Sequence, residues 1–397
     1  PYCAPSFYAY QATTKFADNP AYALSGPATN SPYALAAAYL FAFAMADILR
    51  RILKPSHAHL SSASTLLTWI IRPALLGSSG FWLADWVHGL EQLDEATRST
   101  FLVIKIWTAR AVLFLLVAGA WYWYLSPLSL SVLREPTQKR DAPPKVALLG
   151  FGNTFGAAFL LFTSLAFSLL FLLSQPMGQL ALSACFLAMV LIAELGDSER
   201  DARLLAASKM PNAKDLSASP SHAPSLLEIV CIGLLGFVAF FSTGHQATFT
   251  AIQWRVAFVG FPVVTYPWSP LFVVLNAFGP LSILPAFGVV LLTLWNVAPT
   301  RAKVQQEETG HVRPMRLPGD ILRSALGLLL YVGVLTWSAA LWAWFFRRHL
   351  MLFKIWVPRY MMAGLGLLIT DVALLGAVAV AWWIAARTAK AFGTLYT

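Results

Sequence analysis

The sequence has few charged residues. Asp, Glu, Lys and Arg make up 12% of its 397 residues, whereas an average soluble domain has about a quarter. This scarcity excludes an ordinary soluble domain, and the 58% hydrophobic content indicates a membrane protein. A net charge of +10 would favour nucleic acid binding in a soluble protein. Here most basic residues lie in loops between apolar runs, so they are better explained as a topology signal.

Cysteine and recognisable active-site motifs are also scarce. Cys3, Cys185 and Cys231 have no paired or metal-like spacing, so the sequence predicts neither a disulfide framework nor a metal site. It contains no Ser-His-Asp spacing, Walker loop or paired-carboxylate motif. The stretch "GFGNTFG" (150–156) follows no predicted strand, so its small residues favour close helix packing rather than nucleotide binding. No catalytic motif and no cofactor site are predicted within this chain.

Long apolar runs are what the sequence does contain. A bilayer core about 30 Å thick is crossed by roughly 20 helical residues, and backbone groups in lipid must bond within their own segment. The runs therefore predict an all-α fold, a polytopic transmembrane helix bundle, because the short alternating segments of a β-barrel are not seen. About nine spans are predicted, near residues 33–49, 65–87, 101–125, 146–173, 177–195, 225–243, 268–296, 321–346 and 360–386.

Two segments are predicted not to span. The chain begins at Pro1 without a Met or a charged leader, so we expect it to be part of a longer polypeptide in which residues 1–32 form a non-spanning segment. Residues 250–267 include "FPVVTYPW", which is too interrupted by Pro to cross a bilayer. We expect this segment to be either re-entrant or interfacial.

The distribution of Lys and Arg predicts the orientation of the spans. Nine spans divide the connections into two sets, and one set together with the C-terminal tail holds 18 of the 28 Lys and Arg residues. Because cytoplasmic loops are enriched in these residues, this set and the C-terminus are predicted to be cytoplasmic. Residues 1–32 and 250–267 then lie on the opposite side.

One basic segment breaks this rule. "RRHLMLFKIWVPR" carries Arg347, Arg348, His349, Lys354 and Arg359 on the side that should be poor in positive charge. Arg binds phosphate in a bidentate manner, and apolar residues alternate with these cations as in an interfacial amphipathic piece. The segment is therefore a candidate site for anionic lipid headgroups. Generic anchorage by snorkelling side chains is the alternative.

A second polar cluster lies on the same side. In "FFSTGHQATF" the sixth span ends at Thr243 and is followed directly by Gly244, His245 and Gln246. Gly244 allows a close turn, and the three polar side chains suit a sugar hydroxyl, a phosphate or a neighbouring helix end. Trp254 belongs to an amphipathic patch shortly after. A His at a helix end is by itself usually part of a helix cap, but two clusters on one side favour a shared headgroup site more than either cluster does alone.

Two ionisable residues are predicted inside the membrane at matching depth. Asp371 is eleven residues into the ninth span and Arg110 is nine residues into the third, both counted from the non-cytoplasmic face. A lone carboxylate in the bilayer is costly, so we expect Asp371 to pair with Arg110. A structural ion pair is favoured over a proton relay.

Three stretches resemble the membrane half of the GPI ethanolamine phosphate transferases, in particular the members that act on the third mannose. The clearest are "FFSTGHQATFTAIQWRVAFVGF" (240–261) and "RRHLMLFKIWVPRYM" (347–361), and "WIIRPALLGSSGFWLADW" (69–86) is a weaker match. Their order and spacing fit the C-terminal multi-span region of that family.

The resemblance implies an endoplasmic reticulum enzyme that moves phosphoethanolamine from phosphatidylethanolamine to the third mannose of a GPI precursor. It also implies a lumenal catalytic domain with a Thr nucleophile and two zinc ions, which this chain does not contain, and a small membrane partner, PIG-F. The family's catalytic residues thus correspond to no position here. We expect the chain to bind the lipid substrates, the partner subunit or both.

Two other readings of the residues remain open. A lipid transporter or flippase would need a continuous polar path through the bundle, for which Asp371 and Arg110 are the only support. A non-catalytic scaffold would use the basic loop around Arg347 and Arg348 to dock a soluble domain without contacting substrate. Substitution of the basic loop residues, with assembly measured alongside, would separate the scaffold from a substrate-holding domain.

Overall fold

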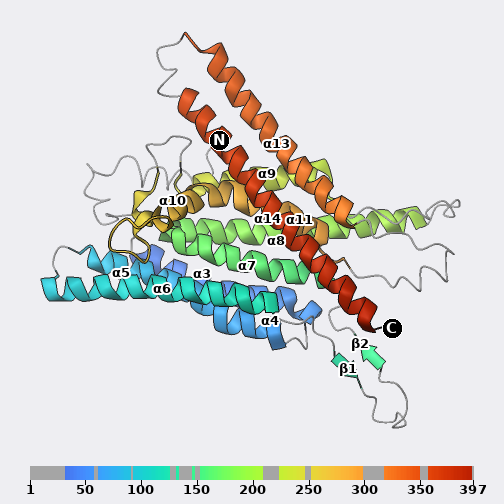
Figure 1. Cartoon of the computed structure of the whole chain (residues 1–397), viewed down its shortest axis with the longest axis horizontal. Helices are drawn as coiled ribbons and strands as arrows, with labels where there is room; N and C mark the ends of the chain where they lie inside the picture. The colour runs from blue at the N-terminus through green and yellow to red at the C-terminus, as the bar shows by residue number, and fades with distance from the viewer. Residues whose placement is uncertain are drawn as a thin grey trace.

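The computed structural model describes residues 32–57, 61–90, 93–125, 131–133, 145–147, 153–208, 223–245, 252–297, 317–348 and 356–395. Within these ranges the chain is a bundle of helices (Figure 1), which confirms the all-α transmembrane fold class. The described residues also include one antiparallel pair of short strands, β1 (Ser131–Leu133) and β2 (Lys145–Ala147). Most of the predicted segment 1–32 lies outside the described residues.

Each predicted span corresponds to one helix or to a consecutive series of helical segments. Two of the spans contain an internal π-helical turn, at η1 and at η6. The helical segments are α3 (Pro32–His57); α4 (Ser61–Thr65), η1 (Leu66–Ile71) and α5 (Arg72–His88); α6 (Glu95–Leu125); α7 (Thr154–Leu173); α8 (Pro176–Ser208); α9 (Leu226–Ser242); α10 (Trp268–Phe278), η6 (Gly279–Ile283) and α11 (Leu284–Leu294); α13 (Leu317–Phe345); and α14 (Val357–Leu395).

The predicted spans need two corrections. The fourth was predicted to begin at residue 146, but α7 begins at Thr154, because residues 145–147 form strand β2 instead. Among the described residues, seven helical stretches are long and apolar enough to cross a membrane. Helix α3 is not among the seven, and α9 is a shorter apolar helix of 17 residues. The predicted number of nine spans is therefore approximate.

The core of the bundle lies around α7 and α11. Every residue of α11 is buried, and Phe159 of α7 stacks on Phe287 of α11 with ring centroids 5.8 Å apart. In lipid, such helices are held by van der Waals packing and close approach. A Cβ added at Gly156 would lie 2.8 Å from the carbonyl oxygen of Leu294, so α7 runs directly against this backbone. This confirms close packing at the end of the stretch 150–156.

Helices α13 and α14 form a hairpin that crosses the other helices obliquely (Figure 1). The Thr336 hydroxyl of α13 donates to the Ala363 carbonyl of α14 at 3.3 Å, and the Ser282 hydroxyl of η6 donates to the Gly366 carbonyl at 3.2 Å. The hairpin is thus joined to the bundle through η6. Helices α9, α11, α13 and α14 meet in this region.

The described part of the segment 250–267 does not form a membrane-crossing helix. It consists of a short 3-10 helix, η5 (Trp254–Phe258), followed by turns, and Val256 is fully buried. The Ser269 hydroxyl at the start of α10 donates to the Ala257 carbonyl at 2.6 Å, which fastens the segment to α10. Its placement as re-entrant or interfacial stays a prediction.

Candidate functional site

The polar end of α9 is a helix cap that turns the chain back into the protein. Gly244 has a φ of +85°, a conformation that glycine adopts without strain. The Gly244 amide donates to the Phe241 carbonyl at 3.1 Å and the His245 amide donates to the Phe240 carbonyl at 3.2 Å. These two bonds form a Schellman motif. As predicted, Gly244 makes the turn, and the turn leaves the His245 side chain 4% exposed.

A chain of hydrogen-bonded polar residues continues from this cap, and all but the part-buried Gln253 are buried. The Thr243 hydroxyl lies 3.0 Å from Nδ1 of His245. The Gln253 amide group donates to the Thr243 carbonyl at 3.0 Å, and the Asn276 amide group donates to Oε1 of Gln253 at 3.3 Å. Residues from the end of α9, the segment before η5 and α10 therefore form one polar chain. We refer to Asn276, Gln253, Thr243 and His245 as the polar chain.

The burial of His245 predicts a pH-dependent stability. Desolvation lowers the pKa of its imidazole from 6.5 to about 4, although the hydrogen bond to the Phe240 backbone acts in the opposite direction. The unfolded protein therefore binds the proton more readily than the folded protein between these two values. We expect the free energy of unfolding to fall as the pH decreases from 6.5 to 4, by about 3 kcal/mol in total.

Denaturant unfolding of the purified protein between pH 4 and pH 7 checks this expectation. The variant His245→Phe keeps an aromatic ring at the position but has no titratable group, so its unfolding free energy should vary less over this range. Parallel curves for the variant and the unsubstituted protein would show that another group controls the acid sensitivity.

A cluster of charged residues around Asp85 also lies near this end of the bundle. Asp85 of α5 is 8% exposed and accepts from Lys105 of α6 and from Arg255 of η5, with an N···O distance of 2.9 Å in each pair. This one buried carboxylate thus joins α5 to α6 and to η5, the segment that follows Gln253 in the sequence. A buried carboxylate between two cations is held by both, and this fixes η5 against α5 and α6.

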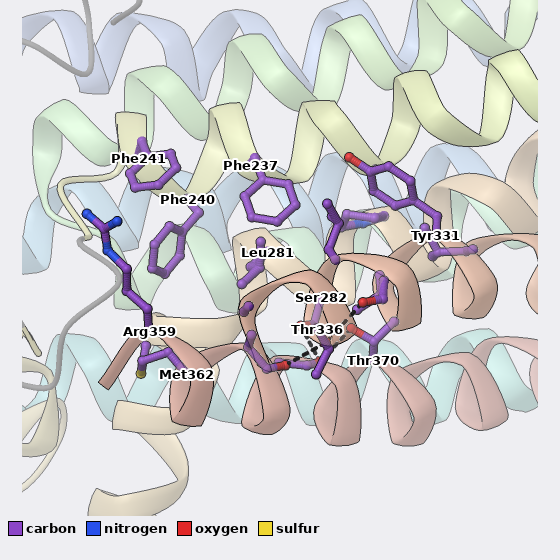
Figure 2. A pocket seen from close by; sticks show the side chains of 18 residues that line it. Phe237, Phe240, Phe241, Leu281, Ser282, Tyr331, Thr336, Arg359, Met362 and Thr370 are labelled. Atoms are coloured by element: carbon purple, nitrogen blue, oxygen red, sulfur yellow. Dashed lines mark hydrogen bonds between the residues drawn. The ribbon is translucent and has the colours of Figure 1, made fainter. Parts of the chain in front are cut away.

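An apolar pocket of about 260 Å³ lies between α9, η6, α11, α13 and α14. Figure 2 shows Arg359 at one end of it, near Phe240 and Phe241, and Tyr331 toward the other end. The lining is almost entirely apolar between these ends. Polar hydroxyls from Ser282, Thr336 and Thr370 also border the pocket, and each of them donates to a backbone carbonyl.

The pocket and the polar chain share a wall. The ring of Phe240 lines the pocket and stacks on the imidazole of His245, with centroids 5.3 Å apart. Phe240 also packs in one cluster with Ala277, Phe278 and Met362, next to Asn276. The structure therefore brings Arg359, Thr243 and His245 into one region of the bundle.

The other predicted site residues are not gathered there. Arg347 and Arg348 are exposed and do not line the pocket, and the Arg347 guanidinium lies 5.1 Å from the ring centroid of Trp344. Trp254 is 64% exposed on η5. Three further predicted residues, Gln246, His349 and Lys354, lie outside the described residues.

The predicted ion pair between Arg110 and Asp371 is not formed. Nε of Arg110 donates to the Gly260 carbonyl at 2.9 Å, and its guanidinium lies 5.3 Å from the ring centroid of Trp107. Oδ1 of Asp371 is buried without a hydrogen-bond partner among the described residues. Counting residues along a helix predicts depth, but the direction in which each side chain faces depends on packing.

Sequence reasoning missed Asp85, Gln253 and Asn276. Asp85 lies two residues before the end of the predicted span 65–87, and Lys105 lies four residues after the start of the predicted span 101–125. Because these helices are antiparallel neighbours, the opposite charges could have been paired by depth. Gln253 and Asn276 are uncharged and gave no such signal.

The described residues contain no group of three or more His, Cys, Asp or Glu side chains that could hold a metal ion. The titratable residues at the site are His245 at the polar chain, the Asp85 cluster and Arg359 at the pocket. These side chains suit hydrogen bonding and charge pairing with a polar headgroup.

Comparison with known proteins shows sequence similarity over most of the chain. It is 33% identical over 259 residues to the Eremothecium gossypii protein named GPI ethanolamine phosphate transferase 3 and 30% identical over 270 residues to the Saccharomyces cerevisiae protein of that name. It is 28% identical over 285 residues to the human "GPI ethanolamine phosphate transferase 3, catalytic subunit".

These three alignments cover 65%, 68% and 65% of this chain, but 22%, 23% and 25% of the relatives in the same order. The chain therefore spans about a quarter of the length of the curated relatives it matches. No protein-family model and no solved structure matches the chain.

Proposed function

We propose that this chain, a homologue of one part of the GPI ethanolamine phosphate transferase 3 proteins, is a membrane domain that holds lipid substrate for phosphoethanolamine transfer. In this proposal the reaction moves phosphoethanolamine from phosphatidylethanolamine to the third mannose of a GPI precursor in the endoplasmic reticulum. The nucleophile and two zinc ions belong to a lumenal domain outside this chain. A PIG-F type subunit is the proposed membrane partner, and the C-terminus is cytoplasmic.

The observation that carries the proposal is the apolar pocket with Arg359 at its end. The guanidinium of Arg359 is exposed at the first turn of α14, where the chain is predicted to leave the membrane on the lumenal side. It stands 5.7 Å from the ring centroid of Trp356. An Arg at the bilayer surface above an apolar pocket suits a phospholipid, whose phosphate binds the guanidinium and whose acyl chain enters the pocket.

The end of the pocket at Arg359 is expected to decide the affinity of the site for a phospholipid. An acyl chain is as well solvated by the bilayer as by apolar side chains, so its entry into the pocket gains little free energy. A hydrogen bond between charged groups is worth about 1.5–3 kcal/mol. Arg359 is therefore expected to provide most of the preference for a phosphate-bearing lipid over the surrounding bilayer.

Replacing Arg359 by Ala in the full-length protein tests this role. We expect the amount of phospholipid that copurifies with the protein and the rate of phosphoethanolamine transfer in membranes both to fall, on the order of tenfold, because a charge-assisted contact is lost. Arg347→Ala is the matched control, since Arg347 also stands over a Trp ring but does not line the pocket. Equal losses in the two variants would point to general surface charge rather than to this pocket.

Filling the pocket is an independent test of the same proposal. Ala363 of α14 lines the pocket, whereas Ala379 of the same helix is exposed. We expect Ala363→Phe to reduce transfer and bound lipid strongly and Ala379→Phe to leave both near the original level. Full transfer by folded Ala363→Phe protein would rule out the pocket as a substrate site.

A further inference from the structure

We propose that His245 accepts a hydrogen bond from the free hydroxyl of a neutral lipid, such as a diacylglycerol, whose acyl chains occupy the apolar pocket. This inference deepens the proposed function and rests on it. It assigns a ligand class to the polar chain formed by Asn276, Gln253, Thr243 and His245.

The hydrogen bonds fix the orientation of one end of the polar chain. A backbone carbonyl only accepts, so the Thr243 carbonyl requires the amide nitrogen of Gln253. Oε1 of Gln253 therefore faces Asn276 and accepts from its amide nitrogen. Oδ1 of Asn276 is left over, and it is buried without a hydrogen-bond partner among the described residues.

We assign the tautomer at the other end from the Thr243 hydroxyl. This hydroxyl has one hydrogen, and the carbonyl oxygens of Ala239 and Phe240 lie 2.8 and 2.9 Å from its oxygen. With the hydrogen donated to one of these carbonyls, the hydroxyl accepts from His245, and Nδ1 of His245 carries the proton. Nε2 of the imidazole is then a bare acceptor, and it too is buried with no partner among the described residues.

In this assignment the atoms left over at the two ends of the polar chain, Oδ1 of Asn276 and Nε2 of His245, are both acceptors. An unsatisfied buried polar group costs about 1–3 kcal/mol, so native proteins provide such groups with partners. Asn276 and His245 are 2% and 4% exposed, which keeps bulk solvent from them. A bound molecule that donates hydrogen bonds would remove this cost.

The chemistry of the acceptors selects the donor. A phosphate offers only acceptors at neutral pH, so in this proposal the polar chain does not take a phosphate, which was one of the three partners suggested by the sequence. An ammonium would need a carboxylate to offset its burial, and Asp85, at this end of the bundle, is already paired with Lys105 and Arg255. A neutral hydroxyl donates one hydrogen bond and carries no charge into the site.

The position of His245 connects this hydroxyl to a lipid. The ring of Phe240 separates the imidazole from the apolar pocket, and it contacts both. In this proposal the Phe240 side chain rotates to admit the lipid hydroxyl to Nε2. A lipid with its acyl chains in the pocket could then place a hydroxyl at the imidazole while its tails stay among apolar residues.

The proposed reaction produces such a lipid. When the phosphorus of phosphatidylethanolamine is transferred, its bond to the glycerol oxygen breaks and a bond to the acceptor sugar oxygen forms. The proton from the sugar hydroxyl ends on the glycerol oxygen, which leaves a diacylglycerol with one free hydroxyl. The polar chain would therefore recognise the lipid product rather than the phosphate of the donor.

Binding of short-chain lipids to the full-length protein in detergent tests the inference. The probes are dioctanoylglycerol, its 3-acetyl ester, which has no hydroxyl, and dioctanoyl phosphatidylethanolamine. We expect dioctanoylglycerol to bind about tenfold more tightly than the acetyl ester, as the loss of one buried hydrogen bond predicts. His245→Phe keeps the ring beside Phe240 and should bring the affinity for dioctanoylglycerol down to that of the ester, which itself should not change.

Each outcome decides one of the two proposals. Equal binding of dioctanoylglycerol and its ester by the unsubstituted protein would show that the lipid hydroxyl contributes no affinity, and would overturn the inference whether or not the variant folds. Tighter binding of phosphatidylethanolamine through His245 would overturn the neutral-hydroxyl assignment. In both cases, loss of lipid binding in Ala363→Phe would still support the pocket as a lipid site. Absence of any saturable lipid binding to the unsubstituted protein would rule out the pocket proposal.

Discussion

Asp85→Asn is expected to be among the most destabilising single substitutions in this chain. The carboxylate is held by Lys105 and Arg255. The amide of Asn has the same size but no negative charge, so both cations lose their ion pair with residue 85. Breaking a buried pair in this way costs about 3–5 kcal/mol. The Arg255 side chain is 43% exposed and contributes less, so we expect a loss near the lower limit, dominated by Lys105, which is 14% exposed.

Thermal and denaturant unfolding of the purified protein in detergent measures this loss. Asp47→Asn is the matched control, because Asp47 has an ion pair with Arg72 but its side chain is 37% exposed. That substitution should cost less than about 1 kcal/mol. Proteolysis near Trp254 should also become faster in Asp85→Asn, since Arg255 holds η5 through Asp85.

A double variant distinguishes charge from shape. Replacing Lys105 by Met in the Asp85→Asn background removes the buried cation that has lost its partner, so we expect part of the lost stability to return. If Asp85→Asn is no more harmful than Asp47→Asn, the cluster is not the structural joint described above.

Gly236→Ala is the second substitution with a large expected effect. A Cβ at this position of α9 would lie 2.3 Å from Cγ of Pro285 and 3.0 Å from the Leu281 carbonyl oxygen. Neither a proline ring nor a backbone carbonyl can rotate away, so α9 must move from α11. Overpacking of this kind costs about 1–3 kcal/mol.

Gly376 provides the comparison within the same bundle. It lies in α14, and an added Cβ would meet nothing within 4 Å. Ala is favoured over Gly in a helix interior by about 1 kcal/mol, so Gly376→Ala should be neutral or stabilising in the same unfolding experiment. Opposite signs for the two substitutions are expected, and a neutral Gly236→Ala would mean that α9 and α11 are less closely packed than described.

Gly236 also links stability to the proposed lipid site. Its neighbours Gly233 and Phe237 line the apolar pocket, so a displaced α9 changes the pocket wall. We expect folded Gly236→Ala protein to retain less copurifying lipid than Gly376→Ala protein.

Much of the fold could be predicted from the sequence, because the bilayer constrains it so strongly. Apolar runs must be helical in lipid, and the described helices fall within or close to the predicted spans. The start of α7 was missed because hydropathy does not separate a buried helix from the short apolar strand β2. The turn at Gly244 was predicted because a glycine after an apolar run is a local signal.

The candidate site was predicted only in part. Thr243, His245 and Arg359 were singled out, but their ligand chemistry depends on contacts with residues that are distant in the sequence. The link between His245 and the pocket runs through Phe240, an ordinary apolar residue. The Arg110 and Asp371 pair failed for a related reason, since residue counting gives depth but not the direction of a side chain.

By itself the sequence determined that this chain is a helical membrane protein, where its helices lie and which of their ends are polar. These properties follow from local composition and from the cost of unpaired backbone groups in lipid. Only the tertiary structure decided that Asp85 joins Lys105 and Arg255, that four helices enclose a pocket bordered by Arg359, and that the imidazole of His245 is buried, with Nε2 unpartnered among the described residues. Those features depend on how helices face one another, and in lipid this is set by close packing and a few polar contacts rather than by hydropathy.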